Sequence, residues 1–462
     1  MICQKPRRVA SRCLFAAVMA FTVELPTVAQ EKSEQRESDA DLVKLAREVQ
    51  AEVAELRGWE YKHPVKAGVY TEAELREFIE KKAFEEEFGP DGLPPVETFL
   101  RTVGLVPADC DVRKTIIDVL LNQVGGFYDP ATKSFNMLSR ADAEYGPLVT
   151  RILVAHELTH ALDDQYIDLD RLIESRPRTE DWSLAITSVV EGSATVLMSR
   201  YTMQAIESGK YDTSEMGRLM RQEMERSQAF MEAPPYFSSL MATYMCGMFF
   251  LTEGQLATPA TGGAIRNVGK RLRMAAADPP VSTEQILHPE KYWNKARRDW
   301  PVEVSDADVE RMLARSGRHV VHKDTVGELL CALLTSDEHR VLDIMLAALP
   351  TYWTNDAATG WGGDRFYLLA EGPTAEAAKK RLEGLKGVWV TLWDTRSDRD
   401  EFVEDYRSER KLPGRWMFPH GERGAVFLYG FDPAEREAVR KRFESEPPAL
   451  LKHNRPWKVT GE

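Results

Sequence analysis

Apolar residues recur at three- and four-residue spacing along much of the chain up to residue 277, which is the pattern of helices that bury one face. The first clear case, "DLVKLAREVQAEVAEL" (41–56), follows a polar segment, residues 30–40, that we expect to form a flexible lead-in. The same spacing predicts helices over 72–89, 95–103, 112–123, 145–166, 182–208, 213–231, 236–253 and 264–277. "SSLMATYMCGMFFL" (238–251) is the most apolar of these segments but is too short to span a membrane, so it predicts a buried helix.

The pattern changes in two places. "VGGFYDPATKSFNML" (124–138) joins a Gly pair and an Asp-Pro turn signal to flanking apolar residues, which predicts a short hairpin. Beyond a boundary predicted between Ser305 and His322, β-branched and aromatic runs alternate with helical patterns. The predicted strands are "RFYLLAE", "GVWVTLW" and "GAVFLYGF", and the predicted helices are "TAEAAKKRLEGL", "RDEFVEDYRSER" and "PAEREAVRKRFE". The fold class is therefore α+β, with a mainly helical domain (41–305) and a smaller α+β accessory domain (320–462).

The N-terminus is typical of a secretory signal peptide, residues 1–29. Its start is basic, "CLFAAVMAFTV" (13–23) is a short apolar run, and small residues precede Ala29. The run is too short for a permanent anchor and no lipid-accepting Cys follows it. We therefore expect an exported protein, periplasmic or extracellular, without a stable membrane anchor. A disordered N-terminus is the alternative.

Composition excludes some classes of partner. Removal of residues 1–29 takes away four basic residues and one acidic residue, so the net charge moves from −13 to about −16. Such an acidic surface argues against nucleic acid and anionic lipid as partners. The three remaining cysteines, Cys110, Cys246 and Cys331, are too few for a disulfide framework. Stability must therefore come from the core.

The strongest chemical signal is "VAHELTHALDDQ" (154–165). His156 and His160 stand four residues apart, so a helix presents both imidazoles on one face, where they can bind one metal ion. Glu157 lies about 100° further round, where its carboxylate can reach a metal-bound water without ligating the metal. The motif predicts the zinc site of a hydrolase with Glu157 as general base. A structural helix that carries two histidines is the alternative.

A third ligand distinguishes the classes of zinc hydrolase. The pattern H-E-x-x-H-x-x-G-x-x-H requires Gly at 163 and His at 166, but this chain has Asp163 and Tyr166. The other possibility is a Glu on a second, downstream helix. Glu191 is the only charged residue between Ser183 and Met198, and a lone carboxylate in such a stripe is costly to bury unless it is paired or binds a metal. An exposed position on a polar face is the alternative for Glu191.

"HELTH" followed by an isolated Glu in "VVEGSAT" resembles the gluzincin metallopeptidases, the thermolysin-like clan. With "STEQILHPEKYW", these motifs are similar to those of poorly characterised bacterial secreted proteins with a zinc-protease signature, over roughly residues 125–292; "GWGGDRFYLL" (360–369) adds to the likeness. The resemblance implies a zincin-like domain in which His156, His160 and Glu191 bind Zn²⁺ and Glu157 is the catalytic base.

The chain departs from thermolysin-like enzymes at Thr195, where they carry an Asp. The groups that support the ligands must therefore differ, and the candidates are Asp163, Asp164 and Thr195. Asp164 lies one turn beyond His160 and is a candidate to orient that imidazole; an exposed charge at the helix end is the alternative. The candidate oxyanion donor is His288, with Tyr292 as a second candidate, and a packed loop without function is the alternative.

Three further segments can be explained by a purely structural role as well as by a function. The predicted edge strand "KSFNML" (133–138) can hold an extended substrate by backbone pairing, or can simply stabilise the helix. "GWGGDRF" (360–366) lacks a phosphate-loop pattern and predicts a turn that leads into a strand. His319 and His322 are interpreted as surface residues.

The sequence therefore predicts a secreted zinc-dependent metallopeptidase that hydrolyses peptide bonds with a zinc-bound water, its partner being a peptide or protein substrate. A non-catalytic zinc-containing envelope or binding protein is one alternative, although the intact Glu157 counts against it. A zinc amidase that acts on cell-wall peptides is the other.

Overall fold

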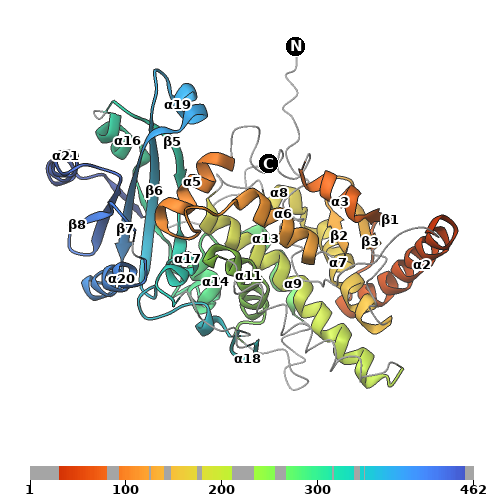
Figure 1. Ribbon diagram of the computed structural model, residues 1–462. Helices are drawn as coiled ribbons and strands as arrows, with labels where there is room; N and C mark the ends of the chain where they lie inside the picture. Colours follow the sequence, from red (N-terminus) through yellow and green to blue (C-terminus); the bar gives the residue numbers. More distant parts are fainter. Residues whose placement is uncertain are drawn as a thin grey trace, which may run out of the picture.

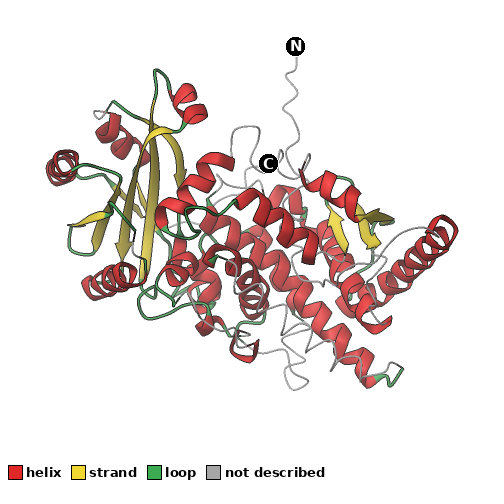
Figure 2. Cartoon of the chain, viewed as in Figure 1, coloured by secondary structure: helices red, strands yellow, loops and turns green. Residues whose placement is uncertain are grey.

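The structure of the chain, a computed structural model, describes residues 31–80, 93–123, 126–139, 147–173, 179–210, 234–254, 267–314, 317–337, 344–347, 349–410 and 412–452. Within these ranges the fold is α+β, as predicted. A body of helices lies between a small three-stranded sheet and a larger five-stranded sheet (Figures 1 and 2). The predicted signal peptide (1–29) and the predicted helix 213–231 lie outside the described residues.

The helical body is built around one long helix, α9 (Glu180–Glu207), which contacts most of the others. Around it lie α2 (Glu31–Arg57), α3 (Glu72–Phe78), α5 (Leu93–Val103), α6 (Val112–Gln123), α7 (Pro147–Ile167), α8 (Leu169–Ile173), α11 (Pro235–Leu251), α13 (Val268–Ala277), α14 (Thr283–Leu287) and α15 (Glu290–Trp293). The predicted helices over 95–103, 112–123, 145–166, 182–208 and 236–253 are confirmed. No helix in the described part of the chain is long and apolar enough to cross a membrane.

One prediction at the N-terminal side needs correction, and another is only partly described. Residues 31–40, predicted as a flexible lead-in, belong to helix α2, which begins at Glu31. A polar helix of this kind gives no apolar periodicity by which the sequence could mark its start. The helix predicted over 72–89 is described only in its first part, α3, because residues 81–92 lie outside the described ranges.

Helices α9 and α11 pack in close backbone contact. A Cβ on Gly192 would lie 2.1 Å from the carbonyl carbon of Gly247, and a Cβ on Gly247 would lie 1.9 Å from the carbonyl oxygen of Ser188. Only glycine fits at both positions, because a Cβ closer than about 3 Å to another backbone atom is a severe clash. The buried helix predicted over 238–251 is confirmed, and Cys246 within it is 1% exposed.

The small sheet has the order β1-β3-β2, made of β1 (Lys66–Thr71), β3 (Ser134–Ser139) and β2 (Gly126–Asp129). The predicted hairpin is confirmed as the antiparallel pair β2–β3. However, β1 pairs in parallel with the whole length of β3, so "KSFNML" is the central strand and its edge is not available to a substrate. Strands β2 and β3 both contact α7, and of the two β2 lies at the edge of the sheet.

The large sheet is antiparallel, in the order β5-β6-β7-β9-β8. Its strands are β5 (His319–Asp324), β6 (Trp361–Glu371), β7 (Glu383–Trp393), β9 (Gly424–Tyr429) and β8 (Trp416–His420). Alternate residues face opposite sides, as the period of a strand requires. Helices α16 (Asp306–Ala314) and α21 (Pro433–Ser445) cover one face, and α5, α17 (Gly327–Leu334) and α20 (Arg396–Glu409) cover the other. The remaining described elements are α18 (Ile344–Ala347), η3 (Pro350–Tyr352), α19 (Ala375–Arg381), β4 (Val302–Val304) and β10 (Leu450–Lys452).

The two predicted domains share one hydrophobic core. A single buried cluster contains Phe99 of the helical body together with Phe366 and Trp389 of the large sheet. Tyr406 in α20 donates its hydroxyl hydrogen to the carbonyl oxygen of Val103 in α5, at 2.7 Å. The buried core is therefore continuous across the predicted boundary between 41–305 and 320–462.

The two histidines of β5 are not free surface residues. His319 Nε2 lies 3.0 Å from the carbonyl oxygen of Gly372, and His322 Nε2 lies 3.0 Å from Asp324 Oδ2. The segment "GWGGDRF" turns at Gly360, which has a φ of +88°, and enters β6 at Trp361. The prediction of a turn leading into a strand is confirmed, with the addition that the strand carries a bulge between Trp361 and Gly363.

Candidate metal centre

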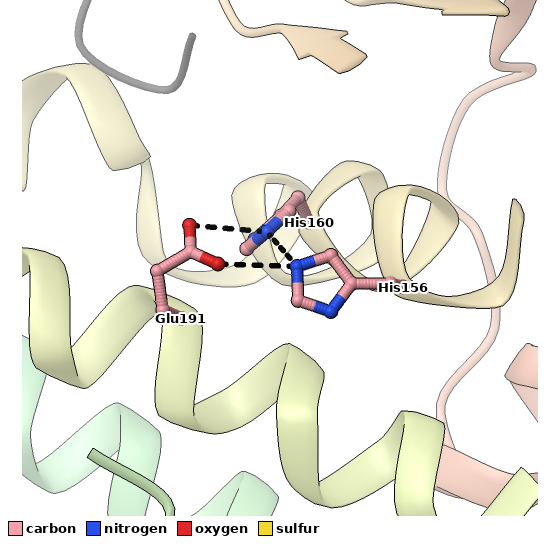
Figure 3. A group of neighbouring side chains, drawn as sticks. All are labelled: His156, His160 and Glu191. Carbon is pink, nitrogen blue, oxygen red and sulfur yellow. Dashed lines mark hydrogen bonds and ion pairs between the residues drawn. The ribbon is translucent and has the colours of Figure 1, made fainter. Parts of the chain in front are cut away.

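Three side chains from two neighbouring helices converge inside the helical body. His156 and His160 lie one turn apart on α7, and Glu191 comes from α9, which packs beside it (Figure 3). All three are buried, with exposed fractions of 6%, 3% and 1%. The fold thus brings together the paired histidines and the lone carboxylate that were the unusual features of the sequence.

The ring nitrogens and carboxylate oxygens of these three side chains lie at the mutual distances expected of ligands that bind one small cation. His156 Nε2 and His160 Nε2 lie 3.1 Å apart, His156 Nε2 lies 3.1 Å from Glu191 Oε2, and His160 Nε2 lies 3.4 Å from Glu191 Oε1. With zinc–ligand bonds of about 2.0–2.1 Å, the corners of a coordination tetrahedron are about 3.3 Å apart. Two imidazoles and a carboxylate form a donor set that zinc accepts in catalytic sites. The residues present therefore fit a zinc ion bound by three protein ligands.

Charge within the cluster favours an ionised carboxylate. Burial by itself would raise the pKa of Glu191, but the imidazoles of His160 and His156 outweigh burial and lower the pKa below its usual value. The carboxylate is therefore present in the form that binds a cation.

Glu157 lies beside this group without belonging to it. Its Oε2 accepts a hydrogen bond of 3.0 Å from the backbone N–H of Tyr128 in β2. Among the described residues, no hydrogen bond reaches its Oε1. Burial raises the pKa of Glu157 to about 8, and the nearby Glu191 carboxylate acts in the same direction, against the imidazole of His156. One carboxylate oxygen is thus held and the other remains free to exchange a proton.

The candidate supporting residues are distributed differently from the prediction. Neither His156 nor His160 has a hydrogen-bond partner for its Nδ1 within the described ranges. Asp164 does not orient His160; its carboxylate accepts from the hydroxyl of Tyr128 (2.6 Å), from Lys133 Nζ (2.7 Å) and from the backbone of Leu169 (3.0 Å). That pattern holds β2 and the start of α8 against α7.

Among the described residues, the Thr195 side chain makes no hydrogen bond to a ligand. Its hydroxyl is buried and has no hydrogen-bond partner in the part of the chain that the structure describes. Asp163, by contrast, accepts a hydrogen bond of 2.7 Å from Ser193 Oγ in α9 and pairs with Arg57 of α2. Of the three candidates, Asp163 is the residue that links the two ligand helices.

The predicted oxyanion donors lie in other clusters. His288 Nε2 pairs with Glu328 Oε1 of α17 at 2.8 Å, and Tyr292 donates its hydroxyl hydrogen to the carbonyl oxygen of Asp278 at 2.6 Å. Thr283, in the short helix before His288, bonds to Asp181, ten residues before Glu191 on α9 and so about 15 Å away along the helix axis. The structure does not bring either residue to the ligand group.

Tyr244 is a site residue that the sequence did not single out. It lies on α11, is 2% exposed, and its ring stacks on the ring of His156 with a centroid distance of 5.9 Å and an interplanar angle of 27°. The close approach of α11 to α9 at Gly192 and Gly247 brings Tyr244 to this position. No local pattern singled out Tyr244, because α11 also carries Ser239 and Thr243 among its apolar residues.

A lysine side chain lies among the members of a second group of carboxylates. Glu284, Asp299 and Asp394 lie close enough together to hold an ion. The ammonium of Lys291 already lies among them, 2.5 Å from Glu284 Oε1 and within 3.9 Å of the other two carboxylates. The ammonium of Lys291 therefore takes the position of a cation in this group and offsets part of its negative charge.

Comparison with known proteins adds one finding. Residues 311–428 match a family described as a domain of unknown function (DUF8575). The matched segment runs from α16 to β9 and does not include α7 or α9, which carry the converging side chains. No curated protein and no solved structure matches the chain.

Proposed function

We propose that the chain is an exported zinc metallopeptidase that hydrolyses peptide bonds. The observation that carries the proposal is the convergence of His156, His160 and Glu191 at ligand spacing, with Glu157 beside them and outside the ligand set. A zinc site that serves only as a structural link requires no additional buried carboxylate next to its ligands. The resemblance of the motifs to the gluzincins supports the same interpretation.

The residues have separate roles in the proposed reaction. His156, His160 and Glu191 would hold the ion, which supplies Lewis acidity toward a water molecule and the carbonyl of the bond that is cut. Glu157 Oε1 takes the proton of the attacking water and passes it to the leaving amine. The N–H of Tyr128 holds Oε2 and thereby fixes the direction in which Oε1 faces.

Burial supports proton transfer at this position. Because Glu157 is 7% exposed, bulk water does not compete freely for its proton. Burial raises the pKa of Glu157 above that of an exposed glutamate and so moves it toward neutral pH, where a general base transfers protons most efficiently.

The test combines metal analysis with turnover of a proteome-derived peptide library. We expect the purified chain to contain about one zinc per molecule and to cleave peptides in a chelator-sensitive way. Glu157→Gln should keep the zinc and lose turnover, by at least about 100-fold. Glu191→Gln should lose zinc, by about 100-fold in affinity or more.

Other outcomes point to the alternatives. A chain that holds zinc but cleaves no peptide, and in which Glu157→Gln changes nothing, would be a non-catalytic zinc protein. Cleavage of cell-wall peptides alone would identify an amidase. A wild-type chain that binds no zinc would contradict the metal site itself.

A further inference from the structure

A buried ion pair joins three helices directly behind the candidate metal centre. Arg57 is the last residue of α2, and its Nη2 contacts both carboxylate oxygens of Asp163 in α7 and lies 2.5 Å from Ser193 Oγ in α9. Ser193 Oγ in turn donates to Asp163 Oδ2 at 2.7 Å. The side chains of Arg57 and Asp163 are only 4% and 3% exposed.

These three residues lie next to the ligands along both helices. Asp163 follows His160 by three residues, and Ser193 follows Glu191 by two. At 1.5 Å per residue, Asp163 lies about 4.5 Å from His160 along the axis of α7, and Ser193 lies about 3 Å from Glu191 along the axis of α9. The cluster therefore fixes the separation of α7 and α9 within about one helical turn of His160 and Glu191.

The ligands themselves have few other restraints. Both Nδ1 atoms of the imidazoles lack hydrogen-bond partners in the described part of the chain, whereas metal-binding histidines almost always donate this N–H to an acceptor. Without such acceptors, the distance between the imidazoles and Glu191 depends mainly on how the helices are held together.

Further bonds hold the end of α2 in place. Arg200 on α9 donates to the carbonyl oxygen of Leu56 at 2.8 Å, and Tyr61 donates to the carbonyl oxygen of Leu158 on α7 at 2.7 Å. The ring of Trp59 stacks on Tyr166 with a centroid distance of 4.4 Å. The segment from Leu56 to Tyr61, which includes Arg57, is thus attached to both ligand helices.

We infer that Arg57 is a positioning residue for the metal centre: its ion pair with Asp163, shared with Ser193, sets the spacing between the histidines of α7 and the glutamate of α9. The inference rests on the proposed zinc site and assigns its geometry to the N-terminal helix α2, which supplies no ligand.

The test separates positioning from general stability. We expect Arg57→Met to weaken zinc binding by about 10- to 100-fold, measured by competition with a chromogenic chelator, and to lower the melting temperature of the metal-free chain. The double variant Arg57→Met/Asp163→Leu replaces the ion pair by apolar groups. It should recover much of the melting temperature but keep the weakened zinc affinity, because apolar packing does not reproduce directional bonds.

Two additional variants make the result decisive. Ser193→Ala removes the hydrogen bonds of Ser193 to Arg57 and to Asp163 but leaves the ion pair between them. This variant should fold, and it should weaken zinc binding by a smaller factor than Arg57→Met does. Arg365→Met breaks the pair with Asp306 outside the site, where the two bonds are 3.0 Å long, and should lower stability without changing zinc affinity. The Co²⁺ absorption spectrum of Ser193→Ala should also change, since it reports ligand geometry.

The possible failures can be told apart. If the wild-type chain binds zinc and all variants bind it equally well, or if affinity returns with the melting temperature in the double variant, the positioning role is wrong while the metal site stands. If the wild-type chain binds no zinc, both the site and the role of Arg57 are wrong.

Discussion

The backbone N–H of Tyr128 lies 3.0 Å from Glu157 Oε2, so that strand β2 directly holds the candidate general base. The same tyrosine donates its hydroxyl hydrogen to Asp164 Oδ2 at 2.6 Å, two turns further along α7. Tyr128 is therefore attached to the helix at two points. Asp164, which we expected to orient His160, acts instead through the strand that contacts Glu157.

Loss of the tyrosine hydroxyl should affect catalysis and leave metal binding intact. In Tyr128→Phe the strand keeps its N–H but loses its anchor on Asp164, so Glu157 is held less accurately. We expect turnover of a cleaved peptide to fall by about 10- to 100-fold. Zinc affinity should stay within about twofold of the wild-type value, because no ligand is touched. A parallel fall in zinc content would show that Tyr128 supports the ligands rather than the base.

The stacking of Tyr244 on His156 predicts a contrast between two substitutions. Tyr244→Phe keeps the ring and should retain zinc affinity, whereas Tyr244→Leu removes the flat surface against His156 and should weaken zinc binding by about 10-fold. Chelator competition measures both. Tyr292→Leu is the matched control, since Tyr292 is also buried but lies outside the site. Equal affinity in Tyr244→Leu and the wild type would refute the role.

The contact between α9 and α11 predicts a severe effect of a single methyl group. In Gly192→Ala the added Cβ would lie 2.1 Å from the backbone of Gly247, so the helices must separate. We expect a loss of more than about 3 kcal/mol in the free energy of unfolding, or failure to fold. Gly362→Ala is the control, because its Cβ would meet nothing closer than 3.4 Å. Urea denaturation compares the two, and similar midpoints would contradict the expectation.

Most helices of the fold could be predicted because their periodicity is local. The ligand set could be predicted for a related reason, since His156 and His160 are spaced by one helical turn and Glu191 is conspicuous in an apolar stripe. Sheet order could not be predicted. "KSFNML" looks like an edge strand until the distant strand β1 is known to pair with it, and that pairing leaves no local pattern.

The supporting residues were the least predictable part of the site. The motif around His288 identifies a turn, but only the tertiary structure shows that His288 faces Glu328 on α17, forty residues later. Arg57 and Tyr244 stand in an ordinary amphipathic helix and an ordinary apolar helix. Nothing in their neighbouring residues distinguishes them from other surface and core positions, because their partners lie on distant segments.

Asp181 predicts a dependence of stability on pH that is independent of the metal centre. It is 1% exposed at the start of α9 and accepts from both the N–H and the hydroxyl of Thr283. Burial raises the pKa of Asp181 to about 7, and the nearby carboxylates of Asp364 and Glu328 act in the same direction, against the bonds from Thr283. The folded chain therefore favours the protonated acid.

The sign of the effect follows from the two pKa values. In the unfolded chain Asp181 titrates near its ordinary pKa of about 3.9. Between that pH and about 7 the folded state binds more protons than the unfolded state, so the contribution of Asp181 to stability is full below about pH 4 and is lost as the pH rises to about 7. The side chain in Asp181→Asn does not titrate, so this variant does not lose stability in this way as the pH rises.

Urea unfolding of both chains between pH 5 and pH 8 checks this expectation. The free energy of unfolding of Asp181→Asn should rise relative to wild type with pH, by at most about 1.4 kcal/mol per pH unit, and level off above about pH 7. Asp306→Asn is the control with opposite sign: burial alone would raise the pKa of Asp306, but Arg365 and Lys323 lower it to about 2, so its difference from wild type should stay constant over this range. A pH-independent difference for Asp181→Asn as well would mean that Asp181 is ionised in the folded chain, with its charge compensated by the bonds from Thr283.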